Sequence, residues 1–267
     1  MLNLEGKVSK YSMNVLKRAY EKGLKLVPVS GRTFDALLVG IDNFEYFDYV
    51  ACTNGTTIYN AKTQELIKRH SLSKDLAIKY YNNFVKYNKD NYAIVNGYYL
   101  GKYGFTQFVK DIKYRNEEEF NYLLSTFREK GLEEILKDSK YEVDKLIANY
   151  SDLLLRDRMY DELHLENRDV QKVVVTSSYK DNIEIFDKDS GKDVAIKEIA
   201  KMYNIDMENV MAIGDNDNDV EMLKTAGLAV AMGNGTKEAK RVADFVTLSN
   251  DEDGAAIAIE KLVLASM

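Results

Sequence analysis

The two ends of the chain alternate between short apolar runs and amphipathic helical patterns. Ser12–Lys22 has the pattern of a helix that Gly23 ends, and Val15, Leu16 and Ala19 share one of its faces. This alternation is typical of an α/β fold with a parallel sheet. It predicts a buried strand at Leu24–Val29 and further strands at Tyr49–Thr53, Asn209–Ile213, Leu228–Ala231 and Phe245–Thr247, with helices at Thr33–Val39, Asp193–Tyr203, Asp219–Thr225, Thr236–Val242 and from about Asp253.

The middle of the chain has a different composition. Twelve of the 19 tyrosines lie between Tyr80 and Tyr160, and Gly131 is the only glycine from Phe105 to Ser190. This shift indicates an inserted α+β domain, residues 73–184, within a core made of residues 1–72 and 185–267. Inside the insert, helix patterns lie near Lys74–Tyr87, Glu117–Glu129 and Ser151–Glu162, and strand patterns near Tyr92–Asn96, Glu142–Ala148, Lys172–Ser177 and Ile183–Phe186.

The overall charge excludes several classes of partner. The 267 residues carry 43 acidic and 37 basic side chains, a net charge of −6, and no basic block. Nucleic-acid backbones need clustered Lys and Arg, so we expect no nucleic-acid partner. No run approaches the roughly 20 apolar residues of a membrane span, and the first residues lack the apolar core of a signal peptide. A single cysteine, Cys52, cannot form an internal disulfide, so we expect a cytoplasmic protein with no membrane partner.

The segment Val210–Leu223 carries the strongest chemical signal. An apolar strand runs into Asp215, Asp217 and Asp219, which crowd the carboxyl end of a parallel strand, where α/β sheets bind ligands. Hard carboxylate oxygens suit Mg²⁺ or Ca²⁺. A calcium EF-hand is excluded, because its sixth and twelfth positions here are Val and Ala rather than Gly and Glu. The alternative is a solvated turn that caps the next helix.

Three further turns could carry chemistry. Ser30 follows a strand and opens a helix, so its hydroxyl and the next N–H groups form a seat for one phosphate. Thr53–Thr56 follows the next strand, and Lys192 lies in the first turn of a helix, where the helix dipole disfavours a cation unless an anion is near. Each has a plain alternative, namely a helix cap, a turn or a surface lysine. The chain has no Walker P-loop and no complete G-x-G-x-x-G, and with His70 and His164 as its only histidines a histidine-based triad is not expected.

The order and spacing of these turns resemble the haloacid-dehalogenase superfamily. Strand–Ser-Gly-Arg, strand–Thr-Asn-Gly, an α+β insert, Gly-Lys before a helix and G-D-x-x-N-D-x-x-M-L occur in the family's order, and Ala212–Thr247 is the most specific block. The chain is most similar to the Cof-type phosphatases with a large inserted cap. The resemblance implies a Rossmann-like core with a parallel sheet and a cap that we expect to set substrate choice. It also implies Mg²⁺-dependent hydrolysis of phosphate monoesters of small metabolites, such as sugar phosphates, through an aspartyl-phosphate.

The resemblance also implies roles for individual residues. A hydroxyl, an ammonium, an amide and a metal ion supply the positioning and charge neutralisation that phosphoryl transfer needs. The implied phosphate- and substrate-binding residues are Ser30, Gly31, Asn54, Lys192 and Asn218, of which Ser30 and Lys192 take part in catalysis, and the implied metal site is Asp215 with Asp219 as its companion. Asn54 is expected at the mouth of the site.

The chain departs from the family at its start. Family members begin with an apolar strand ending in D-x-D-G-T-L, whose first Asp is the nucleophile and second the general acid, and this chain has neither. Asp35, Asp42 and Asp48 lie beyond Ser30, in a helix or loop, and match neither role. We expect that the printed start is too late by about a dozen residues, the alternative being a degenerate relative, and that the chain as printed is inactive. A non-catalytic phospho-ligand-binding protein and a phosphosugar mutase stay open as alternatives, and the motifs indicate no particular oligomeric state.

Overall fold

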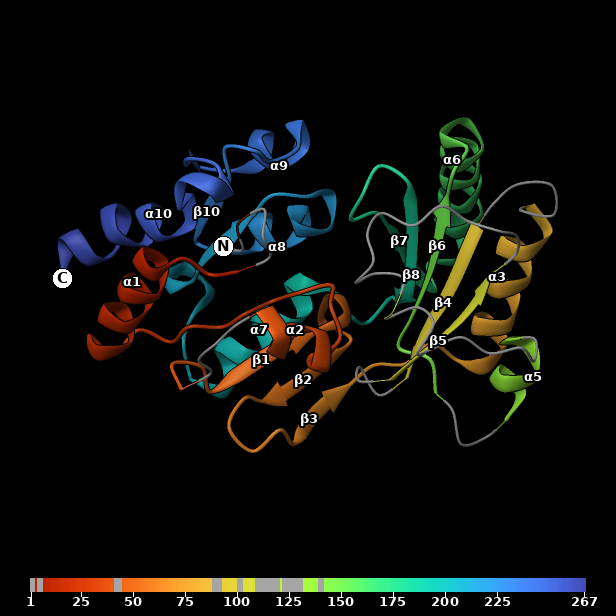
Figure 1. The fold of residues 1–267 in the computed structure, drawn as a ribbon, viewed down its shortest axis with the longest axis horizontal. Helices are drawn as coiled ribbons and strands as arrows, with labels where there is room; N and C mark the ends of the chain where they lie inside the picture. The colour runs from red at the N-terminus through yellow and green to blue at the C-terminus, as the bar shows by residue number, and fades with distance from the viewer. Residues whose placement is uncertain are drawn as a thin grey trace. The chain divides into compact units, whose positions relative to one another are not determined.

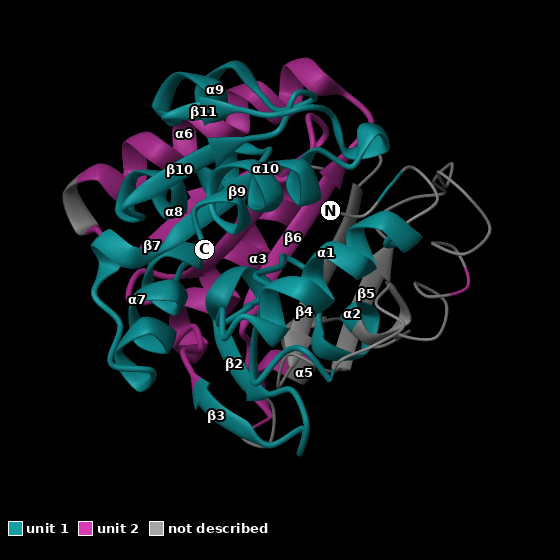
Figure 2. Cartoon of the chain, turned by 90° about the vertical axis from the view of Figure 1, so that its left-hand side faces the viewer, with its two compact units in different colours: residues 1–68, 191–267 teal, residues 69–190 magenta. Residues whose placement is uncertain are grey.

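The computed structural model describes residues 3, 7–40, 45–87, 93–99, 103–108, 121, 132–138 and 142–267. The chain divides into two units, a core unit of Met1–Lys68 with Gly191–Met267 and an inserted unit of Arg69–Ser190 (Figure 2). These boundaries differ from the predicted ones at 72/73 and 184/185. The second differs because strand β8, Asn182–Asp187, pairs with strands of the inserted unit as far as Asp187.

The core unit contains two three-stranded sheets. One has the order β1-β2-β3, with β1 and β2 antiparallel. The other has the order β11-β10-β9 and is parallel throughout, which confirms the parallel pattern predicted for the C-terminal part of the chain. The bounds are β1 Tyr49–Cys52, β2 Thr57–Asn60, β3 Leu66–Arg69, β9 Met211–Gly214, β10 Leu228–Ala231 and β11 Phe245–Val246; β2 and β3 were not predicted.

The segment Leu24–Val29, predicted to be a buried strand, is neither regular nor buried. It is mostly half-buried and forms only two isolated parallel bridges, Leu26 with Phe47 and Val29 with Ala51. Within the described residues, this segment has a strand partner on one side only, and β9 likewise pairs only with β10. Full burial of a parallel strand requires a neighbour on each side, so the prediction was wrong because the described part of the chain supplies a neighbour on one side only. Each segment therefore presents an unpaired edge.

The helices of the core unit occur along the chain in the order that the sequence pattern predicts (Figure 1). Helix α1, Lys10–Glu21, begins after Ser9, whose hydroxyl oxygen accepts a hydrogen bond from the N–H of Ser12. It ends before Gly23, which has φ +87°, so the predicted helix stop is confirmed. The other core helices are α2 Phe34–Gly40, α7 Lys192–Met202, α8 Val220–Thr225, α9 Lys237–Val242 and α10 Gly254–Leu262.

Helices α1 and α10, from opposite ends of the sequence, lie side by side (Figure 1). The hydroxyls of Ser9 and Ser12 both donate to Asp253 Oδ1, at 2.5 and 2.8 Å. About two helical turns further on, Arg18 donates to Glu260 Oε1 at 2.5 Å. These contacts fasten the first helix of the core unit to its last.

Asp48 joins three parts of the core unit. Its carboxylate accepts hydrogen bonds from Lys62 Nζ at 2.7 Å and from the Tyr203 hydroxyl at 3.0 Å, and Lys25 Nζ lies 3.7 Å away. The hydrogen bond from Lys62 is the largest influence on the pKa of Asp48 and, with the Tyr203 bond, holds that pKa below its usual range although partial burial opposes the shift.

We expect Asp48→Asn to lower the free energy of unfolding by about 1 kcal/mol at pH 7. The folded pKa lies below the unfolded value, about 3.9, so this stabilisation is present above that pH and is lost as the pH falls through the folded pKa. Urea unfolding of both proteins at several pH values should show the two free energies converging in acid. A difference that stays constant or grows on acidification would contradict the assignment.

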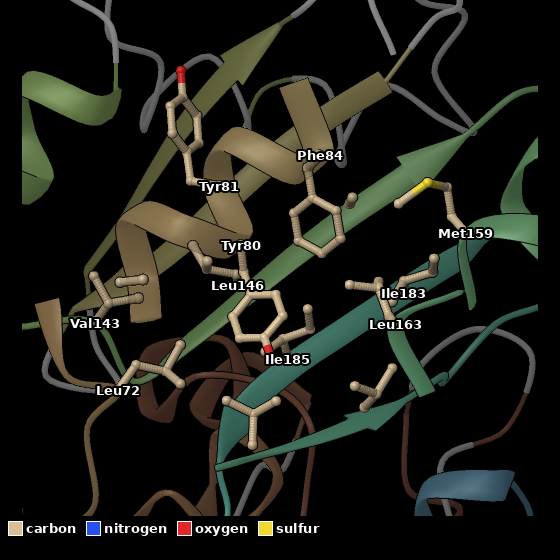
Figure 3. Packing of buried hydrophobic residues seen from close by; sticks show 14 of the residues in the cluster. Leu72, Tyr80, Tyr81, Phe84, Val143, Leu146, Met159, Leu163, Ile183 and Ile185 are labelled. Carbon is tan, nitrogen blue, oxygen red and sulfur yellow. The ribbon is translucent and has the colours of Figure 1, made fainter. Parts of the chain in front are cut away.

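The inserted unit is built on one five-stranded antiparallel sheet of order β5-β4-β6-β8-β7. Figure 3 shows how Tyr80 and Phe84 of α3 and Leu163 of α6 pack with Leu146 of β6 and Ile183 of β8. All five are 2% exposed or less, so Tyr80 packs the interior of the unit rather than offering its ring to a ligand. The bounds are α3 Lys74–Tyr87, β4 Ala93–Tyr99, β5 Tyr103–Phe108, α5 Leu132–Lys137, β6 Lys145–Tyr150, α6 Leu153–Val170, β7 Val173–Thr176 and β8 Asn182–Asp187.

Several predicted elements of the inserted unit can be compared with the structure. Helix α3 has the predicted bounds, whereas α6 begins after Asp152, which caps it, and extends eight residues beyond Glu162. The predicted helix Glu117–Glu129 lies outside the described residues, apart from residue 121. Strand β5 and helix α5 were not predicted. None of the described helices combines the length and the apolar composition that crossing a membrane requires.

Candidate active site

Four short segments of the core unit meet at the ends of its strands. Ser30–Arg32 follows the half-buried segment, Thr53–Gly55 follows β1, Gly214–Asp219 follows β9, and Gly191 opens α7. The first two are joined by backbone hydrogen bonds from the N–H of residue 54 to the carbonyl of residue 30, at 2.9 Å, and from the N–H of residue 53 to the carbonyl of residue 32, at 2.8 Å. The structure thus brings together turns that are up to 189 positions apart in the sequence, since residues 30 and 219 both belong to the site.

Lys192 is the buried cation of this site. Its Nζ lies 2.6 Å from Asp219 Oδ1 and 3.3 Å from Asn218 Oδ1, and its side chain is only 8% exposed. The Gly-Lys pair at the start of α7 places the ammonium here, because the helix begins immediately after Gly191. The acidic partner supplies the local anion that a lysine in a first helical turn was predicted to have.

Both carboxylate oxygens of Asp219 have partners within the protein. Besides the ion pair of its Oδ1, its Oδ2 accepts the backbone N–H groups of Asp215 and Asn216, at 2.9 and 3.0 Å. Burial alone would raise the pKa of Asp219, but the charge and hydrogen bond of Lys192 and the two backbone donors lower it below its usual range. Asp219 is therefore ionised and holds both the lysine and the backbone of the preceding turn.

Asp215 has a different environment. Burial, followed by the negative charge of Asp219, raises the pKa of its carboxyl group above the usual range. Its carboxylate accepts a hydrogen bond from Asn216 Nδ2 at 3.3 Å. A cation beside Asp215 would relieve this repulsion, and Mg²⁺ is commonly bound by one or two carboxylates together with water and phosphate oxygens. The donor chemistry fits such an ion, although no three His, Cys, Asp or Glu side chains converge within the described parts of the chain.

Ser30 and Gly31 form a tight turn beside these groups. The hydroxyl oxygen of Ser30 accepts the N–H of Arg32 at 3.1 Å, which leaves its proton for donation. A Cβ atom built on Gly31 would lie 2.8 Å from Asn54 Oδ1 and 3.8 Å from Asn218 Nδ2. The predicted phosphate-binding turn therefore adjoins Asn218.

Asn54 does not lie at the mouth of the site. It is fully buried, and its Oδ1 accepts a hydrogen bond from Asn218 Nδ2 at 3.3 Å. The expectation of an exposed position was wrong because the chain turns inward at a left-handed residue, with φ +60° at Asn54.

Sequence reasoning also missed the glycines beside the site residues. A Cβ on Gly214 would lie 2.5 Å from the Cβ of Asp219, and one on Gly55 would lie 2.2 Å from the carbonyl oxygen of Gly191, so a glycine directly beside a candidate residue was the available signal.

The described core gathers polar residues at its strand ends and is interrupted by an inserted α+β unit, which makes it a mixed α/β architecture that includes a parallel sheet. A family model described as haloacid dehalogenase-like hydrolase matches residues 1–259, and the chain belongs to this family.

Individual relatives agree with this assignment. The 5-amino-6-(5-phospho-D-ribitylamino)uracil phosphatase YcsE of Bacillus subtilis is 28% identical over 265 residues, which cover 99% of this chain and 92% of that protein. A haloacid dehalogenase-like hydrolase from B. subtilis superposes with a TM-score of 0.79 at 24% identity, covering 98% of this chain and 96% of the other. A sugar phosphatase of haloacid-dehalogenase subclass IIB superposes with a TM-score of 0.74 at 20% identity, covering 96% and 92%. The resemblance to the haloacid-dehalogenase family is thereby confirmed.

Proposed function

We propose that this chain carries the phosphate- and metal-binding part of a Mg²⁺-dependent phosphatase that acts on small phosphorylated metabolites. One observation carries the proposal: the buried ammonium of Lys192 is held between Asp219 and Asn218, and Asn218 in turn adjoins the Ser30–Gly31 turn. A buried cation, an amide and a hydroxyl at one place match the needs of a transferring phosphoryl group. Relatives named as phosphatases support the reaction class. The single cysteine, Cys52, is buried and free, in keeping with the proposed cytoplasmic location.

Each residue has a proposed task. The Ser30 hydroxyl donates to a phosphoryl oxygen, the Asn218 amide orients another, and Lys192 neutralises negative charge. Asp219 holds the lysine in place through the 2.6 Å contact between its Oδ1 and the Lys192 Nζ. Asp215 would be the residue that holds Mg²⁺, which when bound offsets the charge of the phosphoryl oxygens.

The nucleophile is the part of the reaction that residues 1–267 do not supply, since their one D-x-D-G sequence, Asp251–Gly254, lies in a 3₁₀ turn at the start of α10 and does not end an apolar strand. The unpaired edges of β9 and of the Leu24–Val29 segment support the idea that one strand is missing between them. Leu26 and Ile213, from the two segments, pack against the same apolar cluster. We therefore propose that residues 1–267 bind phosphate but turn nothing over.

This proposal can be tested by comparing residues 1–267 with a version to which a strand ending in D-x-D-G is joined at Met1. Both are assayed with Mg²⁺ against a panel of phosphate esters. We expect turnover only from the extended version, together with binding of inorganic phosphate by both. Equal turnover by both would show that an acid already present, such as Asp217, is the nucleophile. Binding without turnover by either would favour a non-catalytic phospho-ligand-binding protein, and transfer of phosphate between sugars would favour a mutase.

Asp215→Asn is expected to abolish Mg²⁺-dependent turnover in the extended version, because it removes the proposed metal ligand. Asp219→Asn is expected to be milder, on the order of 10–100-fold, if that residue acts only by supporting its neighbours. The matched control is Asp217→Asn, because Asp217 belongs to the same turn but is exposed, and its turnover should not change. Steady-state rates over a range of Mg²⁺ concentrations measure all three. Unchanged turnover in Asp215→Asn would remove this carboxylate from the mechanism, and a larger loss in Asp219→Asn would reverse the two roles.

The choice of substrate is assigned to the inserted unit. Its tyrosine-rich composition supplies flat rings with hydroxyl tips, which suit sugars or ring-bearing phosphates. Because Tyr80, Tyr81 and Tyr150 are buried in the interior of that unit, only other tyrosines are available for this task. Exchange of this unit for that of a relative should change which esters are hydrolysed.

A further inference from the structure

The loop Thr53–Gly55 adopts an unusual backbone conformation. Thr53, Asn54 and Gly55 have φ values of +50°, +60° and +85°, three left-handed residues in succession. A β-branched threonine with positive φ is a rare outlier, and such outliers persist only where the surrounding structure enforces them. Backbone strain of this kind often occurs at functional sites, which makes the side chain at the centre of the loop worth examining.

That central side chain belongs to Asn54, and its carboxamide is connected to Lys192 through one other residue. Asn54 Oδ1 accepts from Asn218 Nδ2 at 3.3 Å, and Asn218 Oδ1 in turn accepts from Lys192 Nζ at 3.3 Å. The two ends of a carboxamide are different, one being a donor and the other an acceptor. An acceptor at Asn54 therefore decides which end of Asn218 faces the lysine.

We propose that Asn54 is a positioning residue that fixes the orientation of the Asn218 amide and, through it, the place of the Lys192 ammonium. The inference rests on the proposed function, and it gives Asn54 a role other than contact with the substrate. Without the acceptor, the Asn218 side chain loses one of its two hydrogen-bonding partners and is free to rotate away from the lysine. The Lys192 ammonium is then less firmly held, so it moves and binds phosphate less tightly.

The surrounding chain holds Asn54 rigidly enough for this role. Its N–H donates to the carbonyl of Ser30 at 2.9 Å, so the loop is fastened to the phosphate-binding turn. Two glycines make room for it. A Cβ on Gly31 would lie 2.8 Å from Asn54 Oδ1, and a Cβ on Gly55 would lie 2.2 Å from the carbonyl oxygen of Gly191, the residue before Lys192. The same loop thus contacts both the turn that binds phosphate and the helix start that carries the lysine.

A double-mutant cycle tests the route through Asn218, with inorganic phosphate as the probe and residues 1–267 as the protein. Asn54→Gly removes the carboxamide but keeps a residue that readily adopts φ +60°. We expect Asn54→Gly and Asn218→Ala each to weaken phosphate binding by about fivefold to tenfold, as measured by calorimetric titration, and the double variant to be no weaker than Asn218→Ala. The proposal would be overturned if the losses of phosphate affinity of the two single variants multiplied in the double variant. It would also be overturned if Asn54→Gly left the affinity for phosphate unchanged.

A second measurement is independent of phosphate. In ¹⁵N-labelled protein without ligand, the side-chain amide signal of Asn218, assigned by its loss in Asn218→Ala, should shift or broaden in Asn54→Gly. The matched control is Asn204→Gly, because Asn204 has a similar backbone conformation, φ +55°, but is exposed at the end of α7. An Asn218 signal that is unchanged in Asn54→Gly, or equally changed in the control, would overturn the positioning role. Failure of the parent protein to bind phosphate would count against the proposed function, and the amide signal would still decide the role of Asn54.

Discussion

Lys192→Met is expected to lower the free energy of unfolding by about 3–5 kcal/mol, because it leaves the buried carboxylate of Asp219 without its cation. The two side chains are only 8% and 5% exposed, so water cannot replace the lost partner. The same variant should bind no inorganic phosphate. Loss of binding follows from the missing charge, and loss of stability follows from the charge that stays behind.

The matched control is Lys188→Met. Lys188 also pairs with a neighbouring acid, Asp189, at 2.6 Å, but the two side chains are 52% and 65% exposed. Exposed pairs contribute less than about 1 kcal/mol. Urea unfolding of both variants gives the comparison, and the double variant Lys192→Met with Asp219→Asn should recover part of the loss. Equal small effects in the two lysine variants would show that Asp219 is not a buried charge in the protein.

Gly55→Ala is expected to destabilise the core unit by about 3–5 kcal/mol, the sum of a left-handed backbone and a steric clash. The residue has φ +85°, and its new Cβ would lie 2.2 Å from the Gly191 carbonyl oxygen, a backbone atom that cannot move without displacing the start of α7. Thermal unfolding of the variant measures the effect.

Gly23→Ala separates the two causes. Gly23 has nearly the same φ, +87°, but a Cβ there would meet nothing within 4 Å. Its substitution should cost only the backbone part, about 1–2 kcal/mol. If both alanine variants lose the same stability, the contact between the Thr53–Gly55 loop and α7 is looser than the structure shows.

The sequence predicted elements well where the signal is local. Helix α3 and strand β10 have the predicted bounds, because each is a clear apolar pattern with turn residues at both ends. The Leu24–Val29 segment was misjudged, since burial of a strand depends on neighbours that its own pattern does not encode. Strand β2 was missed because it follows closely on the left-handed Thr53–Gly55 loop and has polar residues at both of its ends, although most of it is buried. Strand β3 was missed because it is half-exposed and ends in Lys68 and Arg69.

For the candidate site too, local features could be predicted from the sequence, whereas the packing of remote segments could not. The residue types at strand ends and helix starts were visible in the sequence, and the structure brings Lys192, Asn218 and Asp219 together. The depth of Asn54 was not visible, because its burial depends on a left-handed turn that packs against a helix 137 positions further on, at Gly191. Distances between segments that are remote in sequence are set by packing, which no single segment specifies.

The pairing of α1 with α10 has a consequence for how the protein is made. Ser9 and Asp253, which join these helices, are 244 residues apart, so ribosomes working at 5–20 residues per second deliver the second partner roughly 10–50 s after the first. The inserted unit, Arg69–Ser190, is complete before that moment. Its sheet can form while the chain is still growing, whereas the apolar cluster that includes the face of α1 stays incomplete until synthesis is nearly finished, because Ala256, Ile259 and Leu264 belong to it. The nascent core unit is therefore the part of this protein that needs protection from aggregation in the cell.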